Sequence, residues 1–166
     1  MPTTYNKVAS STLSSTQSSV TFSSIPSTYT DLVLVVSATS NTTSGSYPYL
    51  RFNSDSTSNY SRTMFGGTGT TPQTDRSPNT SEGYFIYGNQ VTTNGSFNAI
   101  VNIQNYSNTT TYKTFVSRTN TTNDWGVEAV VGMWRSTSAI NQIVIYCGSN
   151  SFVSGSTLTL YGIKAA

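Results

Sequence analysis

The chain has 166 residues, which is enough for one domain with a real core and too short for two enzyme-sized lobes. Charged residues make up only 8% of the sequence, against a usual share of about 25%. Serine (28), threonine (29) and asparagine (15) dominate instead, and histidine is absent. The composition therefore excludes Ser-His-Asp and Cys-His nucleophile systems, histidine general bases and histidine-ligated metals.

The formal net charge is +2, and the basic residues are scattered rather than clustered. They are Lys7, Arg51, Arg62, Arg76, Lys113, Arg118, Arg135 and Lys164. Binding to phosphate backbones or anionic membrane surfaces needs several basic side chains gathered on one face. We therefore expect no direct nucleic-acid partner and no membrane association.

The single cysteine, Cys147, excludes an internal disulfide and a CxxC metal motif. We expect it to be a small buried hydrophobic residue in a strand over Ile140–Cys147. The first twenty residues contain no apolar run of signal-peptide length, and the longest apolar stretch is Leu32–Val36. These features predict a chain that folds in a reducing cytoplasm and is not embedded in a membrane.

Apolar and polar residues alternate along much of the chain, which predicts half-buried strands. Within Gly126–Arg135, for example, every second residue from Val127 to Met133 shares one face, opposite Glu128 to Trp134. The nearly continuous apolar run Asp31–Ala38 is typical of a strand buried on both faces. In chain order, the predicted strands are Tyr5–Ser10, Ser18–Ile25, Asp31–Ala38, Tyr49–Asn53, Tyr60–Phe65, Gly83–Tyr87, Phe97–Tyr106, Tyr112–Arg118, Val127–Arg135, Gln142–Cys147 and Thr157–Ile163.

About eleven short strands separated by Gly-, Pro- and Asn-rich turns predict an all-β fold. Strands at this spacing favour an antiparallel β-sandwich, and we expect a jelly-roll-like one. We assign residues 20–166 to this single domain. Residues 1–19 are rich in serine and threonine, and we expect them to form an N-terminal arm that adds a strand to a neighbouring subunit or lies along another protein.

The segment Gly66–Ser81 is the longest stretch without a periodic pattern. Its prolines and glycines predict a surface loop, and a loop of this length in a small domain is often functional. It does not end in the Gly-Lys-Ser/Thr of a phosphate-binding loop. We expect it to be either a mobile loop or a partner-contact loop.

Six carboxylates could in principle carry acid–base or metal chemistry, as a hydrolase would require. They are Asp31, Asp55, Asp75, Glu82, Asp124 and Glu128. We expect Asp31 and Glu128 to lie near strand starts, where turn capping is more common than catalysis. Asn53–Thr57 offers oxygens at alternating positions but lacks the glycine and bidentate glutamate of a calcium loop, so a hairpin turn is favoured and no metal is expected.

Aromatic residues make up 12% of the sequence and most fall on or beside predicted strands. We expect Phe97, Phe115, Trp125 and Trp134 to fill the core. Exposed aromatic side chains could instead form a sugar-binding platform or a subunit interface. The candidates for such a platform are Tyr47, Tyr49, Tyr84, Phe85 and Tyr87.

Several segments, taken together and in order, carry a resemblance to a known family. They are Val8–Ser15, Val20–Leu32, Leu50–Asn53 with Asp55, Ser58–Ser61, Ile103–Tyr106, Tyr112–Thr114 with Ser117 and Arg118, Gly132–Thr137, Phe152, Gly155–Thr157 and Leu160–Ile163. In this respect the chain resembles small β-rich virion structural proteins of tailed bacteriophages, cyanophages among them. The resemblance implies a structural role in the virus particle, without catalysis and without a cofactor.

Members of such families serve as head decoration (cement) proteins, generic structural proteins or tail-fibre components. A fibre would need a shaft repeat, and no such period occurs in this sequence. We therefore expect a capsid decoration protein on the outer surface of the head, made in the host bacterial cytoplasm. It would form a homo-oligomer, with a trimer favoured, and bind the major capsid protein.

The residues we expect to contact the partner lie in the arm and in the glycine- and proline-rich segment. They are Tyr5, Val8, Gly66, Gly67, Gly69, Pro72, Arg76 and Pro78. The alternative is a tail-fibre or receptor-recognition module that binds host surface carbohydrate. A hydrolase is the third and least favoured possibility.

Overall fold

The computed structural model describes residues 4–41, 45–87, 95–121 and 126–164. The described residues form twelve β-strands and no α-helix, so none of them belongs to a helix that could span a membrane. The strands are β1 (Tyr5–Thr12), β2 (Ser19–Phe22), β3 (Asp31–Thr39), β4 (Tyr49–Phe52), β5 (Tyr60–Gly67), β6 (Pro72–Thr80), β7 (Gly83–Tyr84), β8 (Ser96–Ile103), β9 (Lys113–Thr121), β10 (Val127–Trp134), β11 (Ile143–Tyr146) and β12 (Thr157–Ile163).

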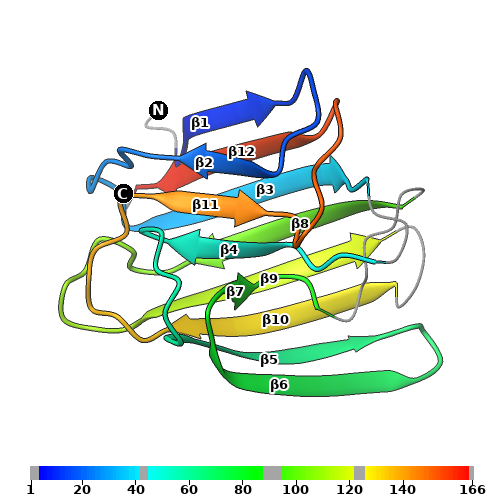
Figure 1. Cartoon of the computed structure of the whole chain (residues 1–166). Coiled ribbons are helices and arrows are strands. Elements are labelled where there is room, and N and C mark those ends of the chain that lie inside the picture. The colour runs from blue at the N-terminus through cyan, green and yellow to red at the C-terminus, as the bar shows by residue number, and fades with distance from the viewer. Residues whose placement is uncertain (1–3, 42–44, 88–94, 122–125, 165–166) are drawn as a thin grey trace.

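The strands form two antiparallel sheets. The large sheet has the order β1-β12-β3-β8-β9-β10-β5-β6, and the small sheet has the order β2-β11-β4-β7. The small sheet lies across one face of the large sheet, which leaves the other face of the large sheet uncovered (Figure 1). The predicted antiparallel β-sandwich is confirmed, while the jelly-roll connectivity stays a prediction.

One apolar core fills the space between the two sheets. Leu34 of β3 lies opposite Val101 of β8, and Leu50 of β4 lies opposite Ile145 of β11; all four are completely buried. Full burial of a side chain of this size stabilises the fold by about 1.5–3 kcal/mol. The expected core positions of Phe97, Phe115 and Trp134 are confirmed; Trp125 lies outside the described residues.

The predicted loop at Gly66–Ser81 is wrong. Residues up to Gly67 continue β5, and Pro72–Thr80 form β6, so the segment is mostly a β-hairpin. Apolar and polar residues do not alternate along β6. It is an edge strand with no core to face, and its residues are all exposed or half-buried. Pro72 and Pro78 are tolerated there because an edge strand leaves some backbone N–H groups without a ladder partner.

The N-terminal segment is part of the sandwich. β1 pairs antiparallel with β12 of the same chain, with a register irregularity between Lys7 and Ala9. Val8 and Ala9 pack against the core. β1 is therefore an edge strand of the large sheet, and its expected contact with a neighbouring subunit stays a prediction.

One further strand prediction and one turn prediction need correction. β7 covers only Gly83–Tyr84 of the predicted Gly83–Tyr87, because the consecutive buried residues Phe85 and Ile86 break the strand alternation. Asn53–Thr57 is not a hairpin turn, since β4 and β5 belong to different sheets. The segment instead crosses from one sheet to the other, with Asn53 and Ser54 at positive φ.

Cys147 is completely buried, as predicted, but it lies directly after β11 rather than within the strand. Burial raises the pKa of its thiol, while hydrogen bonds to Ser40 and Ser46 oppose that shift. The Ser46 hydroxyl lies 3.6 Å from the sulfur and also donates to the Cys147 carbonyl. The cysteine thus serves as a packed core residue.

Candidate functional site

The uncovered face of the large sheet carries an apolar patch on β5, β8, β9 and β10. We call it the outer sheet face; it comprises Phe65, Ile100, Val116, Val127, Ala129, Val131 and Met133. Phe65 is 51% exposed, Val127 61% and Val131 44%. Contiguous apolar side chains on the surface of a soluble domain mark an interaction site.

Cross-strand register makes the patch continuous. Val131 of β10 lies opposite Val116 of β9, and Ala129 lies opposite Phe65 of β5. Ile100 of β8 adds one more strand only through its diagonal position to Val116, because its direct partner on β9 is Arg118, which lies between Ile100 and Ala129. The patch therefore spans four adjacent strands of one sheet.

Val127, Ala129, Val131 and Met133 of β10 face outwards because Trp134 and Val130 on the same strand are buried in the core. Trp134 is 2% exposed and its ring packs at 5.6 Å from that of Phe52 and 6.3 Å from that of Tyr60 (centroid distances). Its indole Nε1 donates to Asp55 Oδ2 at 2.7 Å. Gly132, on the same inward side, leaves room for the Phe115 ring.

Positive charges lie on the same side of the large sheet as the patch, with Arg118 within it, between Ala129 and Ile100. One row of paired residues crosses the whole large sheet from Lys7 through Val116 and Val131 to Arg76. Lys7 and Arg76, at the two ends of this row, are exposed, as is Arg118. The described carboxylates are engaged elsewhere: Asp31 with the Asn105 N–H, Asp55 with Trp134, Asp75 with Arg62, Glu82 with Arg51 and Glu128 with the Tyr87 N–H.

Six of the eight residues expected to contact a partner adjoin this face. Gly66, Gly67, Gly69 and Pro72 line a shallow groove together with Val127. A second groove contains Arg76 and Pro78 beside Val131 and Met133. These residues lie at the edge of the patch. The sequence prediction did not include its apolar centre.

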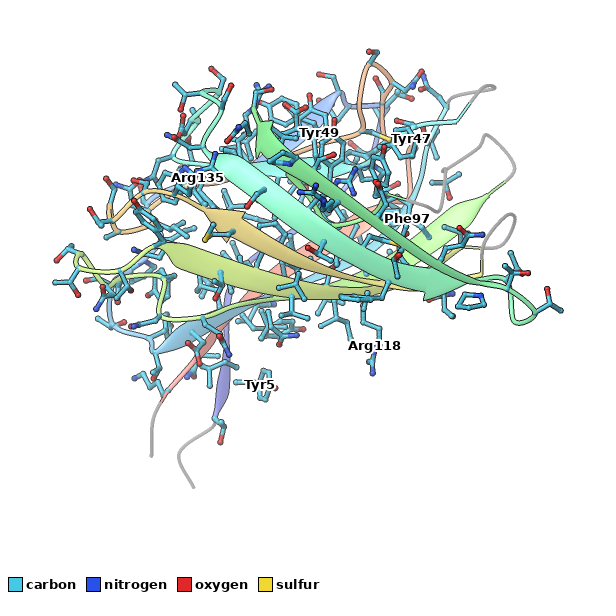
Figure 2. All side chains as sticks on the ribbon, turned by 90° about the horizontal axis from the view of Figure 1, so that it is seen from below. Tyr5, Tyr47, Tyr49, Phe97, Arg118 and Arg135 are labelled. Atoms are coloured by element: carbon cyan, nitrogen blue, oxygen red, sulfur yellow. The ribbon has the colours of Figure 1, made fainter. Side chains whose placement is uncertain are left out.

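The other two predicted contact residues belong to β1. Tyr5 is 60% exposed and lies opposite Ile163 at the far edge of the large sheet. Val8 is half-buried and packs against the core. Figure 2 shows Tyr5 and Arg118 on one side of the molecule and Tyr47 and Tyr49 on the opposite side.

A second surface feature lies on the exposed side of the small sheet. It is a groove of about 550 Å³, which we call the tyrosine groove, lined by Gly45, Ser46, Tyr47, Tyr49, Glu82, Tyr84, Gly148, Ser149 and Asn150. Its three tyrosines are half-buried, so each ring keeps part of its surface accessible. They are three of the five aromatics expected to form a platform; Phe85 is instead completely buried in the core.

Strand pairing places tyrosines side by side across the small sheet. Tyr49 of β4 lies opposite both Tyr146 of β11 and Tyr84 of β7. The Tyr49 and Tyr146 rings are stacked, with centroids 5.1 Å apart, and the Tyr47 ring stacks on Tyr87 at 5.2 Å. These contacts hold the rings in fixed orientations before any ligand arrives.

An ion pair closes one side of the tyrosine groove. Arg51 Nη2 lies 3.2 Å from Glu82 Oε2, and its guanidinium lies over the Tyr49 ring at 5.5 Å. Glu82 also accepts hydrogen bonds from the Tyr84 hydroxyl at 2.9 Å and from Ser81 Oγ. Burial alone would raise the pKa of Glu82, but these hydrogen bonds and Arg51 lower it overall, so the carboxylate is charged and its charge is balanced.

Two buried charged residues support the segment that carries Tyr84 and Tyr87. The Arg62 guanidinium lies 3.2 Å from the centre of the Tyr87 ring and 5.5 Å from that of Tyr84. Glu128, 3% exposed, accepts a hydrogen bond from the Tyr87 N–H at 2.6 Å. We expected Glu128 to cap a turn because it lies near a strand start. It instead anchors a segment distant in the sequence.

Among the described residues, no three Asp, Glu, Cys or His side chains gather as a metal site would require. Asp55 accepts hydrogen bonds from Thr57, Asn59 and Trp134, so it organises the crossing turn. Asp31 begins β3 and accepts from the Asn105 N–H, as expected for a capping residue. Asp124 lies outside the described residues.

No protein-family model and no curated protein matches the chain. Among solved structures, the exo-inulinase from Aspergillus awamori aligns over 96% of this chain and 29% of its own, with 8% identity and a TM-score of 0.34. The chain thus spans less than a third of the inulinase's length. Alginate lyase Aly36B, in complex with alginate trisaccharide, aligns over 82% of this chain and 72% of its own, with 10% identity and a TM-score of 0.34. At these scores the alignments define no common function.

Proposed function

We propose that the protein is a non-enzymatic virion structural protein that docks on a larger protein shell through its outer sheet face. The observation that carries this proposal is the exposed apolar patch around Val127 and Val131, on a chain in which only 8% of residues are charged. Surface apolar residues scattered singly need no explanation, but a patch that spans four strands favours a partner.

The charges on this side of the large sheet favour a particular kind of partner. Lys7, Arg76 and Arg118 are all positive, so a second copy of the same face would bring like charges towards one another. A partner with an apolar centre and acidic residues around it is complementary. We therefore propose the subunits of a capsid lattice, rather than another copy of this face, as the occupant.

The bacteriophage resemblance supports the same assignment, with the major capsid protein as the partner and the head surface as the location. Self-association, as a trimer, would use other surfaces such as the β1 edge. The tail-fibre alternative predicts a few dozen copies per particle or fewer, whereas a shell protein is present in hundreds.

Heads assembled without this protein provide the test, because purified protein can be added back and the bound copies counted. We expect wild-type protein to bind in hundreds of copies and Val131→Glu to bind in less than a tenth of that number, because the new carboxylate would be desolvated in the contact. Thr21→Glu is the control, because Thr21 is exposed on β2 of the small sheet, away from the outer sheet face. Equal binding of the Val131→Glu variant and wild type contradicts docking through this face.

A further inference from the structure

We propose that the tyrosine groove binds an uncharged oligosaccharide. The proposal concerns the exposed side of the small sheet and does not rest on docking through the large one. It starts from three half-buried tyrosines, Tyr47, Tyr49 and Tyr84, that line one groove of about 550 Å³. A volume of this size accommodates a few sugar rings and lies within the usual range for ligand sites, about 300–1,000 Å³.

The tyrosine rings offer the kind of surface that a pyranose ring recognises. One face of a hexose presents several C–H bonds, which pack on the electron-rich face of an aromatic ring, while its hydroxyls point sideways to polar groups. Tyr49 and Tyr84 lie on neighbouring strands with ring centroids 6.0 Å apart, inclined by 56°. Two adjoining rings inclined to each other favour a chain of sugars that bends over them rather than a flat polymer surface.

Polar groups line the groove beside the rings and are available to sugar hydroxyls. Glu82 supplies carboxylate oxygens at one side of the groove, and the turn Gly148–Asn150 supplies hydroxyl, amide and backbone groups at the other. Glycine at 148 adopts φ of +58°, and a Cβ there would lie 2.8 Å from Ser46 Oγ. The turn can therefore approach the groove wall closely only with glycine at this position.

The electrostatics of the groove favour a neutral sugar. The Glu82 carboxylate is already paired with Arg51, and Arg51 also donates to the Ser81 carbonyl at 3.2 Å. An acidic sugar would have to compete with Glu82 for this guanidinium and would bring its carboxylate near that of Glu82. Neutral hydroxyls can instead bond to the ion pair without breaking it.

The groove is preformed, which lowers the entropic cost of binding. The Tyr49 ring is held against Tyr146, and the Tyr84 ring is in edge contact with Tyr87 at 5.7 Å. The buried Arg62 supports the Tyr84 and Tyr87 rings from below. Little side-chain freedom is therefore left to lose when a ligand binds.

The test is a titration of the full chain with three neutral hexasaccharides, maltohexaose, cellohexaose and laminarihexaose, and with an alginate hexasaccharide as the acidic comparison. We expect binding of at least one neutral hexasaccharide, weakened about tenfold or more by Tyr49→Ala or Tyr84→Ala. Tyr112→Ala is the matched control, since this tyrosine is exposed but lies outside the groove, and it should bind as wild type does.

Thermal unfolding checks that each variant is folded, and chemical-shift mapping on the wild-type protein supplies an answer that needs no variant. Shifts concentrated at residues 45–49, 82–84 and 148–150 support the proposal. Four outcomes would each overturn the proposal. They are binding of the alginate hexasaccharide alone, shifts confined to other surfaces, a Tyr112→Ala loss equal to that of the folded groove variants, and no binding of any neutral hexasaccharide.

Discussion

Asp55 illustrates how one side chain can organise a connection between two sheets. It lies in the turn that leaves β4 and accepts hydrogen bonds from the Trp134 indole at 2.7 Å and from the Thr57 N–H at 2.8 Å. The indole N–H belongs to a nearly buried ring, so it would be costly to leave without an acceptor. A turn residue thereby fixes the position of one of the largest core side chains.

We predict that Asp55→Ala lowers the free energy of unfolding by about 1–3 kcal/mol, because the indole N–H loses its acceptor. Asp55→Asn keeps an acceptor oxygen at the same place and should cost less. Urea denaturation at pH 7 measures both. Equal losses for the two variants would show that the contact with Trp134 does not contribute to the stability.

The same carboxylate predicts a pH dependence. Burial acts to raise the pKa of Asp55, but the hydrogen bonds from Thr57, Trp134 and Asn59 outweigh it and lower the pKa from 3.8 to about 2. A carboxyl whose pKa is lower in the folded state stabilises the fold above its unfolded pKa and loses that contribution as the pH falls. We expect wild-type stability to fall between about pH 5 and pH 2 more steeply than that of Asp55→Asn, as measured by thermal unfolding across this range.

Gly132 is a second residue whose identity follows from a single contact. A Cβ built on it would lie 2.0 Å from Cζ of Phe115, the residue directly opposite on β9. Aromatic rings often cover glycines on neighbouring strands in this way. The ring is itself completely buried and has little room to move away.

We predict that Gly132→Ala destabilises the protein by about 1–3 kcal/mol through overpacking. The double variant Gly132→Ala/Phe115→Leu should recover part of this loss relative to the sum of the single changes, because the smaller side chain makes room for the methyl group. A double-mutant cycle by urea denaturation measures the coupling. Strict additivity would mean that the two residues do not compete for this space.

At the scale of the element, β10 shows where the sequence is informative and where it is not. Its alternation predicted the strand, but both faces carry apolar residues, so the pattern alone did not decide which face would be buried. The decision comes from tertiary packing: Trp134 and Val130 fill the core, and Val127 and Val131 are left outside.

Valine-to-threonine substitutions at adjacent positions of β10 test this orientation with matched chemistry. The change keeps the side-chain shape and replaces one methyl group with a hydroxyl. Val130→Thr should lower stability by about 1–3 kcal/mol, because its hydroxyl would be buried. Val131→Thr, on the outer sheet face, should change it by less than about 0.5 kcal/mol; similar losses at both positions in thermal or urea unfolding contradict the assignment of faces.

β6 and β1 are the two edge strands of the large sheet, and the sequence led to different predictions for them. β1 was predicted as a strand, but its Ser/Thr-rich surroundings suggested a detached arm. β6 was missed, because an edge strand with Pro72 and Pro78 has neither alternation nor strong β-propensity. Both strands lie at an edge of the large sheet, where each pairs with a single neighbouring strand.

Hydrogen exchange on the isolated protein tests the place of β1. We expect amides of Tyr5–Thr12 that bond to β12 to exchange much more slowly than those of the exposed segment Thr109–Thr111. Exchange of β1 at the rate of an unfolded peptide would restore the detached-arm interpretation. Further protection on assembly would be expected if β1 also pairs with a neighbour.

At the scale of the whole molecule, the sandwich architecture was predictable because period-two patterning and strong β-propensity recur through most of the chain. The two surfaces were predictable only in part. Tyr47, Tyr49 and Tyr84 were recognised as platform candidates, but their union with Glu82 in one groove depends on strand pairing that no local pattern reveals. The outer sheet face likewise depends on which side of the large sheet the small sheet covers.

The low charge of the molecule leads to a prediction about its docking. An interface centred on Val127 and Val131, with few charged residues in or beside it, should respond weakly to salt, since few ion pairs can be screened. We expect the protein to remain on particles when ionic strength rises from about 0.1 to 1 M, a range over which the Debye length falls from about 10 to 3 Å. Release at moderate salt, followed by sedimentation and quantification of the particles, would contradict an apolar attachment.

The outer sheet face and the tyrosine groove lie on opposite sides of one thin sandwich, so occupation of one leaves the other open to solvent (Figure 2). A particle coated through the first would display the second many times over. Such multivalent presentation can turn a weak single contact into durable attachment, with gains in avidity of about 10²–10⁴ without any new contact. A coat of this design would reinforce the container and hold it near a glycan-covered surface with the same copies.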